Sequence, residues 1–103
     1  MESWFYLIIA GFSEVAFAIC LKLSEQFTKI VYTILFIVFA IISFFFMSKA
    51  MRDLPISIVY AVWTGIGISG TTVFEIIMSG ELNPMRILLI IVLMFCILGL
   101  KVT

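Results

Sequence analysis

The sequence predicts an all-helical integral membrane protein with four transmembrane helices. Of its 103 residues, 65% are hydrophobic and 12% are charged, whereas soluble domains average about 45–50% apolar and about 25% charged residues. Four apolar runs approach the roughly 20 helical residues that are needed to cross about 30 Å of hydrocarbon. Short polar loops leave almost nothing outside the membrane, so we expect one transmembrane domain over residues 1–103.

The charge composition excludes several classes of function. Six Lys or Arg residues balance six Asp or Glu residues, and His is absent. The chain therefore has no basic surface that would hold a nucleic acid. No nucleophile stands beside a base and no phosphate-binding loop is present, so we expect neither an enzyme nor a cofactor. Cys20 and Cys96 fall inside apolar runs without metal-ligand spacing, which is typical of small buried hydrophobic residues.

The first apolar run covers residues 4–23 and is interrupted by Glu14 near its middle. Its Ala16-Phe17-Ala18 segment resembles the cleavage site of a secretory signal. That interpretation is rejected because the preceding region carries Glu2 and no Lys or Arg, and because the run is long and contains a carboxylate.

The other three runs cover residues 30–48, 56–78 and 85–102. The second contains no charge. The third follows Pro55, which suits a first helical position because its missing N–H would be unpaired there. We therefore expect four consecutive helices joined by three short loops.

The positive charges are balanced across the membrane. Loops one and three share a side and carry Lys22, Lys29 and Arg86, whereas Lys49, Arg52 and Lys101 belong to the other side. Lys and Arg near span ends normally set the orientation, so this chain has no preferred one. The balance favours insertion in both directions and an antiparallel homodimer. The alternative is a chain that is oriented by a partner or by its N-terminus.

The dimer hypothesis has a second basis in the number of helices. Four short helices can hardly enclose a polar cavity at the membrane centre, whereas eight can. Transporters commonly place the substrate site near the midplane, between two inverted halves.

Glu14 is the strongest candidate for a functional residue. It lies about 15 Å along a helix that starts at Trp4, close to the bilayer centre. A charged group at that depth costs about 2.5–3.5 kcal/mol and usually faces a bundle interior or a wet cavity. No other run offers a cation at mid-depth, which argues against a purely structural ion pair. We expect Glu14 to bind a proton or a cation.

Gly11 and Phe17 share a helix face with Glu14. The glycine leaves room for a ligand or a neighbouring backbone, and the phenylalanine offers an aromatic wall. The alternative interpretation is that these residues only serve helix packing.

The third run contains Tyr60, Trp63, Thr64 and Gly67 at steps of three and four residues, which predicts a shared face. Aromatic side chains with polar tips can lie against a cation and hydrogen-bond a carboxylate. Trp63 lies deeper than an interfacial aromatic belt would explain. Gly65 and Gly67 weaken the helix and predict a hinge.

Two further residues leave alternatives open. Ser43 either hydrogen-bonds Glu14 or bonds a carbonyl of its own helix one turn back. Glu75 is either a second functional acid or a residue that reaches the membrane interface, since Gly80 lies about a turn further on.

The chain resembles the small multidrug resistance transporters over nearly its whole length. The resemblance rests on a lone glutamate in the segment GFSEV and on the segment LPISIVYAVWTGIG, residues 11–15 and 54–67. It implies an antiparallel dimer in a bacterial inner membrane that exchanges protons for cations. Glu14 would be the shared proton and substrate site, with Tyr60 and Trp63 beside it.

Within that family, the chain is most similar to the guanidinium exporter subtype. Gly11, the WTGIG segment at residues 63–67 and the ending GLK at residues 99–101 match it, and Ser43 matches one of its site positions. The subtype usually has Trp where this chain has Phe17, whose ring donates no hydrogen bond. The resemblance therefore implies a proton-coupled exporter of guanidinium or substituted guanidinium ions. The alternative is a broad exporter of quaternary ammonium ions or multiple drugs. In some members of the family such an exporter is a heterodimer of two related chains.

Two other classes of function compete with an exporter. The same buried carboxylate suits a proton or cation channel, which stoichiometric exchange would exclude. An assembly subunit of a larger membrane complex would keep its function when Glu14 is replaced by Gln.

Overall fold

A computed structural model describes the backbone of residues 2–102 and the side chains of residues 2–100. Four helices follow one another along the chain: α1 (Glu2–Leu23), α2 (Ile30–Ala50), α3 (Ile56–Ser79) and α4 (Pro84–Val102). The predicted all-helical architecture is confirmed. The side chain of Lys101, which entered the charge balance, lies outside the described residues.

The first three helices are long and apolar enough to cross a membrane, and the apolar part of α4, Pro84–Leu100, is shorter. Pro55 is the N-cap of α3, one residue before the first helical position that the sequence predicts for it, and Pro84 is the first residue of α4. Proline suits the start of a helix. There its fixed φ is compatible with the helix and its missing N–H leaves no bond unmade. Gly80 ends α3 with a φ of 72°, a left-handed conformation that glycine adopts without steric cost.

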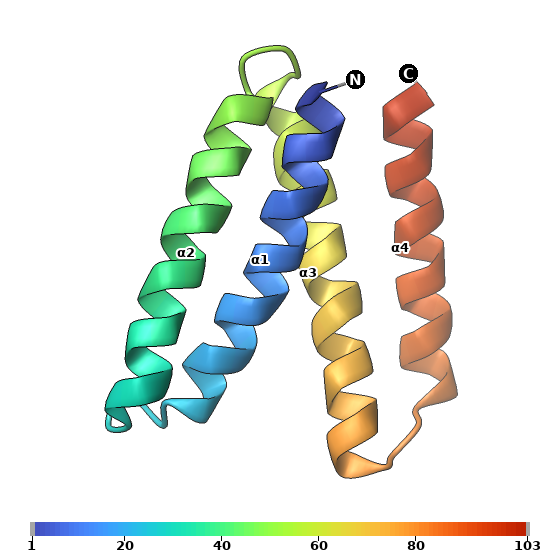
Figure 1. Ribbon diagram of the computed structural model, residues 1–103. Coiled ribbons are helices and arrows are strands. Elements are labelled where there is room, and N and C mark those ends of the chain that lie inside the picture. Colours follow the sequence, from blue (N-terminus) through green and yellow to red (C-terminus); the bar gives the residue numbers. More distant parts are fainter. Residues whose placement is uncertain (1, 103) are drawn as a thin grey trace.

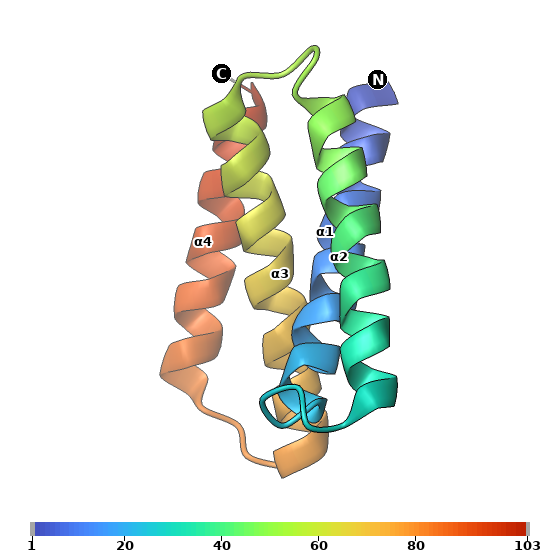
Figure 2. The same ribbon diagram turned by 90° about the vertical axis from the view of Figure 1, so that its left-hand side faces the viewer.

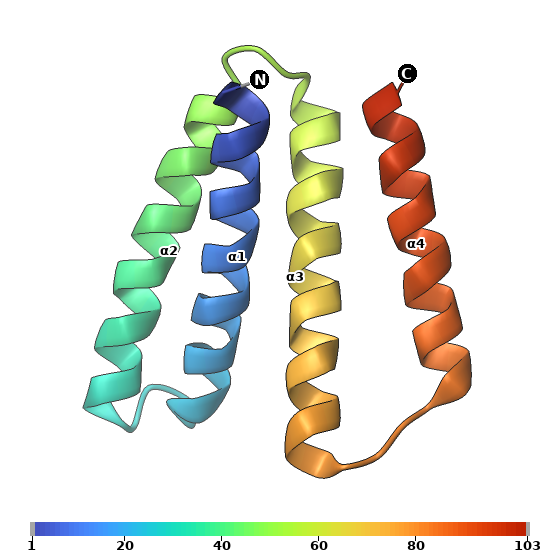
Figure 3. The same cartoon turned by 45° about the vertical axis from the view of Figure 1, so that its right-hand side comes forward.

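The helices form a flat layer rather than a closed bundle (Figures 1 and 2). Its principal extents are 41 × 34 × 16 Å. Across the layer the order is α2, α1, α3 and α4 (Figure 3). Helix α1 therefore packs against both α2 and α3, whereas α4 approaches only α3 within residues 2–102. The start of α1 and the end of α4 lie at the same end of the layer (Figure 1).

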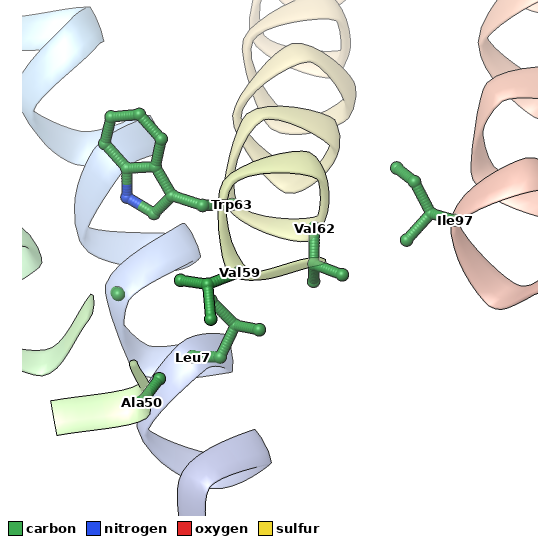
Figure 4. Close-up of a cluster of buried hydrophobic side chains, with 7 residues drawn as sticks. Leu7, Ala50, Val59, Val62, Trp63 and Ile97 are labelled. Atoms are coloured by element: carbon green, nitrogen blue, oxygen red, sulfur yellow. The ribbon is translucent and has the colours of Figure 1, made fainter. Parts of the chain in front are cut away.

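The hydrophobic core is small and lies mainly where α1, α2 and α3 meet. Figure 4 shows Leu7 of α1 beside Val59 of α3, with Ala50 of α2 nearby. Among the described residues of α4, Ile97 is the buried member of this cluster and points toward Val62, while Leu93 and Met94 pack against it partly buried. Large apolar side chains elsewhere on all four helices are exposed. In water such surfaces would mark an interaction site, but in a bilayer they contact lipid.

Glycines line the seam between α1 and α3. A Cβ added at Gly11 would lie 2.7 Å from the side chain of Ile66, and one at Gly70 would overlap the side chain of Val15. Small residues at membrane helix interfaces let two backbones approach closely. The two helices therefore need these glycines in order to pack at the observed distance.

Side-chain hydrogen bonds stabilise the loop between α1 and α2. Between α1 and α2, Glu25, Gln26 and Phe27 have φ values of 49°, 63° and 66°, a conformation that costs about 1–2 kcal/mol per residue. The hydroxyl of buried Ser24 accepts a bond from the Phe27 N–H at 3.1 Å and donates one to the Leu21 carbonyl at 2.7 Å. These bonds offset part of the strain.

We predict that Gly70→Ala destabilises the protein by about 1–3 kcal/mol, the usual cost of overpacking a tight contact. Val15 is branched at Cβ and has little freedom to move away from the added methyl group. Thermal unfolding in detergent micelles measures the effect. Gly99→Ala is the matched control, because a Cβ at Gly99 meets no atom within 4 Å. Equal melting temperatures for the two variants would contradict the close packing of α1 against α3.

Candidate functional site

Glu14 lies on the side of α1 that faces α3, and its carboxylate is inserted into that seam. The carboxylate lies so close to Gly67 that a Cβ added there would overlap Oε1. Oε1 is buried and has no hydrogen-bond partner among the described side chains. Within residues 2–100, neither ion pair involves Glu14. A buried, unpartnered carboxylate oxygen is costly, and binding a proton or a cation would remove that cost.

An aromatic wall stands next to Glu14. It is centred on Trp63, whose side chain projects from α3 toward α1 (Figure 4). Ring centroids of Phe17, Phe44 and Tyr60 lie 6.3, 5.8 and 5.8 Å from that of Trp63, within the range of aromatic pairs. Phe36 extends the wall by an edge-on contact with Phe17 at 5.7 Å. The wall presents π faces, which attract cations.

Ser43 joins the site by hydrogen bonds that the sequence did not reveal. Its hydroxyl donates to the Ala10 carbonyl at 2.7 Å and accepts from Trp63 Nε1 at 2.8 Å. Both expected partners, Glu14 and a carbonyl of its own helix, are wrong. The reason is that Ser43 faces α1 at Ala10, whose small side chain leaves the backbone carbonyl within reach.

The predicted common face of α3 is divided. Trp63 and Gly67 are buried against the other helices, whereas Tyr60 is 58% exposed and Thr64 is also exposed. Tyr60 and Thr64 line a groove between α3 and α4. One residue turns an α-helix by about 100°, so Trp63 and the neighbouring Thr64 cannot point the same way. Tyr60 reaches the site only through its ring contact with Trp63.

The glycines of α3 have packing contacts. Gly67 makes room for the Glu14 carboxylate, and a Cβ at Gly65 would overlap Ile97 of α4. Helix α3 runs without interruption through both positions. Thr71 donates a hydrogen bond to the Gly67 carbonyl at 2.8 Å, a contact of the kind that bends helices. The predicted hinge stays a prediction.

Glu75 lies near the end of α3 and pairs with a residue of α4. Its carboxylate forms an ion pair with Arg86 Nη1 at 3.0 Å, and both side chains are about half exposed. This exposed ion pair favours the interfacial interpretation of Glu75, which stays a prediction. Gly11 lies on α1 against Ile66, one turn before Glu14, and it supports helix packing directly.

Sequence reasoning missed Phe36 and Phe44 as parts of the aromatic wall. Both lie on α2, at seven residues before and one residue after Ser43. The spacing of seven places Phe36 and Ser43 on one face of the helix, whereas Phe44 lies about 100° further round it. The signal was obscured because apolar residues surround them on every side of α2.

The comparisons with known proteins agree with these features of the chain. A family model described as "Small Multidrug Resistance protein" matches residues 2–94. The chain belongs to the small multidrug resistance protein family. It is a multi-pass membrane protein of that family, which is not a family of enzymes.

Relatives within the small multidrug resistance family carry a common name. A protein of Proteus vulgaris called "Guanidinium exporter" is 42% identical over 100 residues, covering 96% of this chain and 96% of the relative. Proteins with the same name in Escherichia coli K12 and Citrobacter freundii are 37% and 42% identical over 102 residues, covering 98% of this chain and 97% of each relative.

We predict that Gly67→Ala weakens cation binding by about tenfold or more, because the added methyl group occupies the place of the Glu14 carboxylate. A shift of about 1.4 kcal/mol in binding free energy corresponds to that factor. Isothermal titration of guanidinium into the purified protein measures the affinity. Ser48→Ala, at an exposed serine of α2, should bind like the unmodified chain. An unchanged affinity in Gly67→Ala would mean that the position of the carboxylate is not critical for binding.

Proposed function

We propose that this protein exports guanidinium-like cations in exchange for protons. The buried Glu14 Oε1, which has no hydrogen-bond partner among the described residues, carries the proposal. A carboxylate accepts two parallel hydrogen bonds from a planar guanidinium, and the aromatic wall covers the flat face of such an ion. The family and the printed name of the relatives support the same substrate class.

The proposed cycle depends on competition at Glu14. A cation and a proton cannot both occupy the carboxylate, so binding of one releases the other. Each is released only to the side that is open at that time, with Gly65 and Gly67 as the hinge. Phe17 and Trp63 lie beside the cation, Tyr60 supports the ring of Trp63, and Gly11 lets α3 approach the same face of α1. A site that stayed empty during the switch would dissipate the proton gradient.

An antiparallel dimer in the bacterial inner membrane completes the proposal. The layer is 16 Å thick in its shortest direction, so one chain cannot wrap a cavity on all sides. Helix α4 approaches only α3 within the described residues, which leaves its other faces available to a second copy. The balanced charges permit both orientations. Two Glu14 carboxylates would then share one substrate site.

A broader substrate range is the second candidate. The ring of Phe17 packs against Phe36 and Phe44 and has no hydrogen-bond donor. Such a wall accepts alkyl or aryl substituents as readily as a bare guanidinium. Substituted guanidinium ions, quaternary ammonium ions and a heterodimer with a related chain all fit this feature.

We predict that Glu14→Gln abolishes guanidinium-driven proton flux, because an amide neither releases a proton nor pairs with a cation. The assay uses liposomes that contain only the purified chain, an imposed guanidinium gradient and a pH-sensitive dye. Glu75→Gln is the matched control, since this acid is about half exposed and pairs with Arg86; its flux should stay within about twofold of the unmodified protein, as is usual for surface changes.

Three results would lead to other conclusions. Undiminished flux in Glu14→Gln would refute the role of the carboxylate. Proton flux without any organic cation would indicate a channel. Flux with tetraethylammonium but not with guanidinium, in folded protein, would favour the broader exporter.

We predict that a variant forced into a single membrane orientation is inactive. Two variants with opposite orientations should restore activity when they are expressed together. Glu2→Lys with Ser48→Lys adds positive charge at one end, and Gln26→Lys with Glu81→Lys adds it at the other. All four positions are exposed. In bacteria without their own exporter, each variant alone should give no guanidinium tolerance, while coexpression should restore it. Full tolerance from either variant alone would exclude the antiparallel dimer.

A further inference from the structure

Among the described residues, the hydroxyl of Ser43 on α2 forms hydrogen bonds with both α1 and α3. It receives the indole N–H of Trp63 from α3 and donates to the Ala10 carbonyl of α1. Ser43 and Ala10 are fully buried, and Trp63 is 8% exposed. These linked groups are called the relay: the Trp63 indole, the Ser43 hydroxyl and the Ala10 carbonyl. The relay joins three helices at one point.

The relay ends on the helical turn that contains Glu14. In an α-helix the carbonyl of residue 10 accepts the N–H of residue 14. A carbonyl oxygen has two lone pairs, so the Ala10 oxygen can hold both the Glu14 N–H and the Ser43 hydroxyl. Ser43 therefore acts on the peptide group that fixes where Glu14 leaves α1.

The hydrogen bonds of the relay also limit what its members can do. A serine hydroxyl has one hydrogen to donate, and an indole has one N–H. In this structure both hydrogens are used inside the relay. Neither Ser43 nor Trp63 can donate to the Glu14 carboxylate while the relay is intact, and Phe17 has no donor at all.

We propose that Ser43 is a positioning residue: it transmits displacement of the Trp63 ring to the backbone of Glu14 and does not itself contact the substrate. A cation that presses on the indole face shifts its N–H, and the shift reaches the Glu14 turn through the Ala10 carbonyl. The inference rests on the proposed function for its substrate, while the relay itself rests on the two hydrogen bonds of Ser43.

A spectroscopic test separates the relay from transport. The uniformly nitrogen-15-labelled protein in lipid bicelles gives one indole N–H resonance from each of its two tryptophans, assigned with Trp63→Phe. Ser43→Ala should shift both the Trp63 indole resonance and the Glu14 amide resonance. Ser48→Ala, a serine exposed on the same helix, should shift neither. A Trp63 shift without a Glu14 shift would overturn the relay.

Binding of guanidinium gives the second measurement. Ser43→Ala should weaken binding by about tenfold, the scale expected when a buried donor loses its acceptor. In the Ser43→Ala background, adding Trp63→Phe should cost much less than it does alone, since the relay is already broken. Independent, additive losses would overturn the proposal, because they would mean that Ser43 contacts the ligand separately.

The controls keep each failure distinct. If Ser43→Ala does not fold, Ser43→Cys replaces it, because cysteine has a similar volume and a weak donor. In Ser43→Cys the Trp63 indole resonance and the Glu14 amide resonance should both shift. A shift of only one of the two would overturn the relay. If neither the unmodified protein nor any variant binds guanidinium, the proposed function fails. The shifts of the Trp63 indole and Glu14 amide resonances still test the relay in that case.

Discussion

The close approach of α1 and α3 is the constraint on which the site depends. Gly67 has no side chain at the point where the Glu14 carboxylate enters the seam. Gly11 and Gly70 hold the same two helices together on either side of that point, against Ile66 and Val15. A larger residue at any of the three would separate the helices and expose the carboxylate to lipid. Packing and chemistry are therefore set by the same contact.

The polar groups near this seam differ in whether they have hydrogen-bond partners. In hydrocarbon, polar groups need partners within the protein, and Ser43 and Trp63 satisfy each other and the backbone. Oε1 of Glu14 is the exception among the described side chains. Ser43 and Trp63 are thus held by hydrogen bonds, whereas Oε1 of Glu14 accepts none from the described residues. That contrast supports the proposal that Glu14 is a binding group.

Much of the fold follows from hydropathy, because a span of a given length must be helical and must lie in lipid. The depth of Glu14 follows from counting along the helix. The partners of Ser43 could not be predicted, because α2 is apolar on every side and its sequence does not fix its rotation. The division between Tyr60 and Trp63 was missed for a related reason: steps of three and four residues describe a face about 100° wide, and the boundary between buried and exposed falls within it.

Trp63 gives the site an intrinsic optical label. The chain has two tryptophans, and the other, Trp4, lies near the start of α1. Indole emission responds to the hydrogen bond on its N–H and to nearby charge, and the indole of Trp63 contacts Ser43 and lies beside Phe17. A chain in which Trp4 is replaced by Phe would report the state of the site in its own fluorescence, without an attached dye.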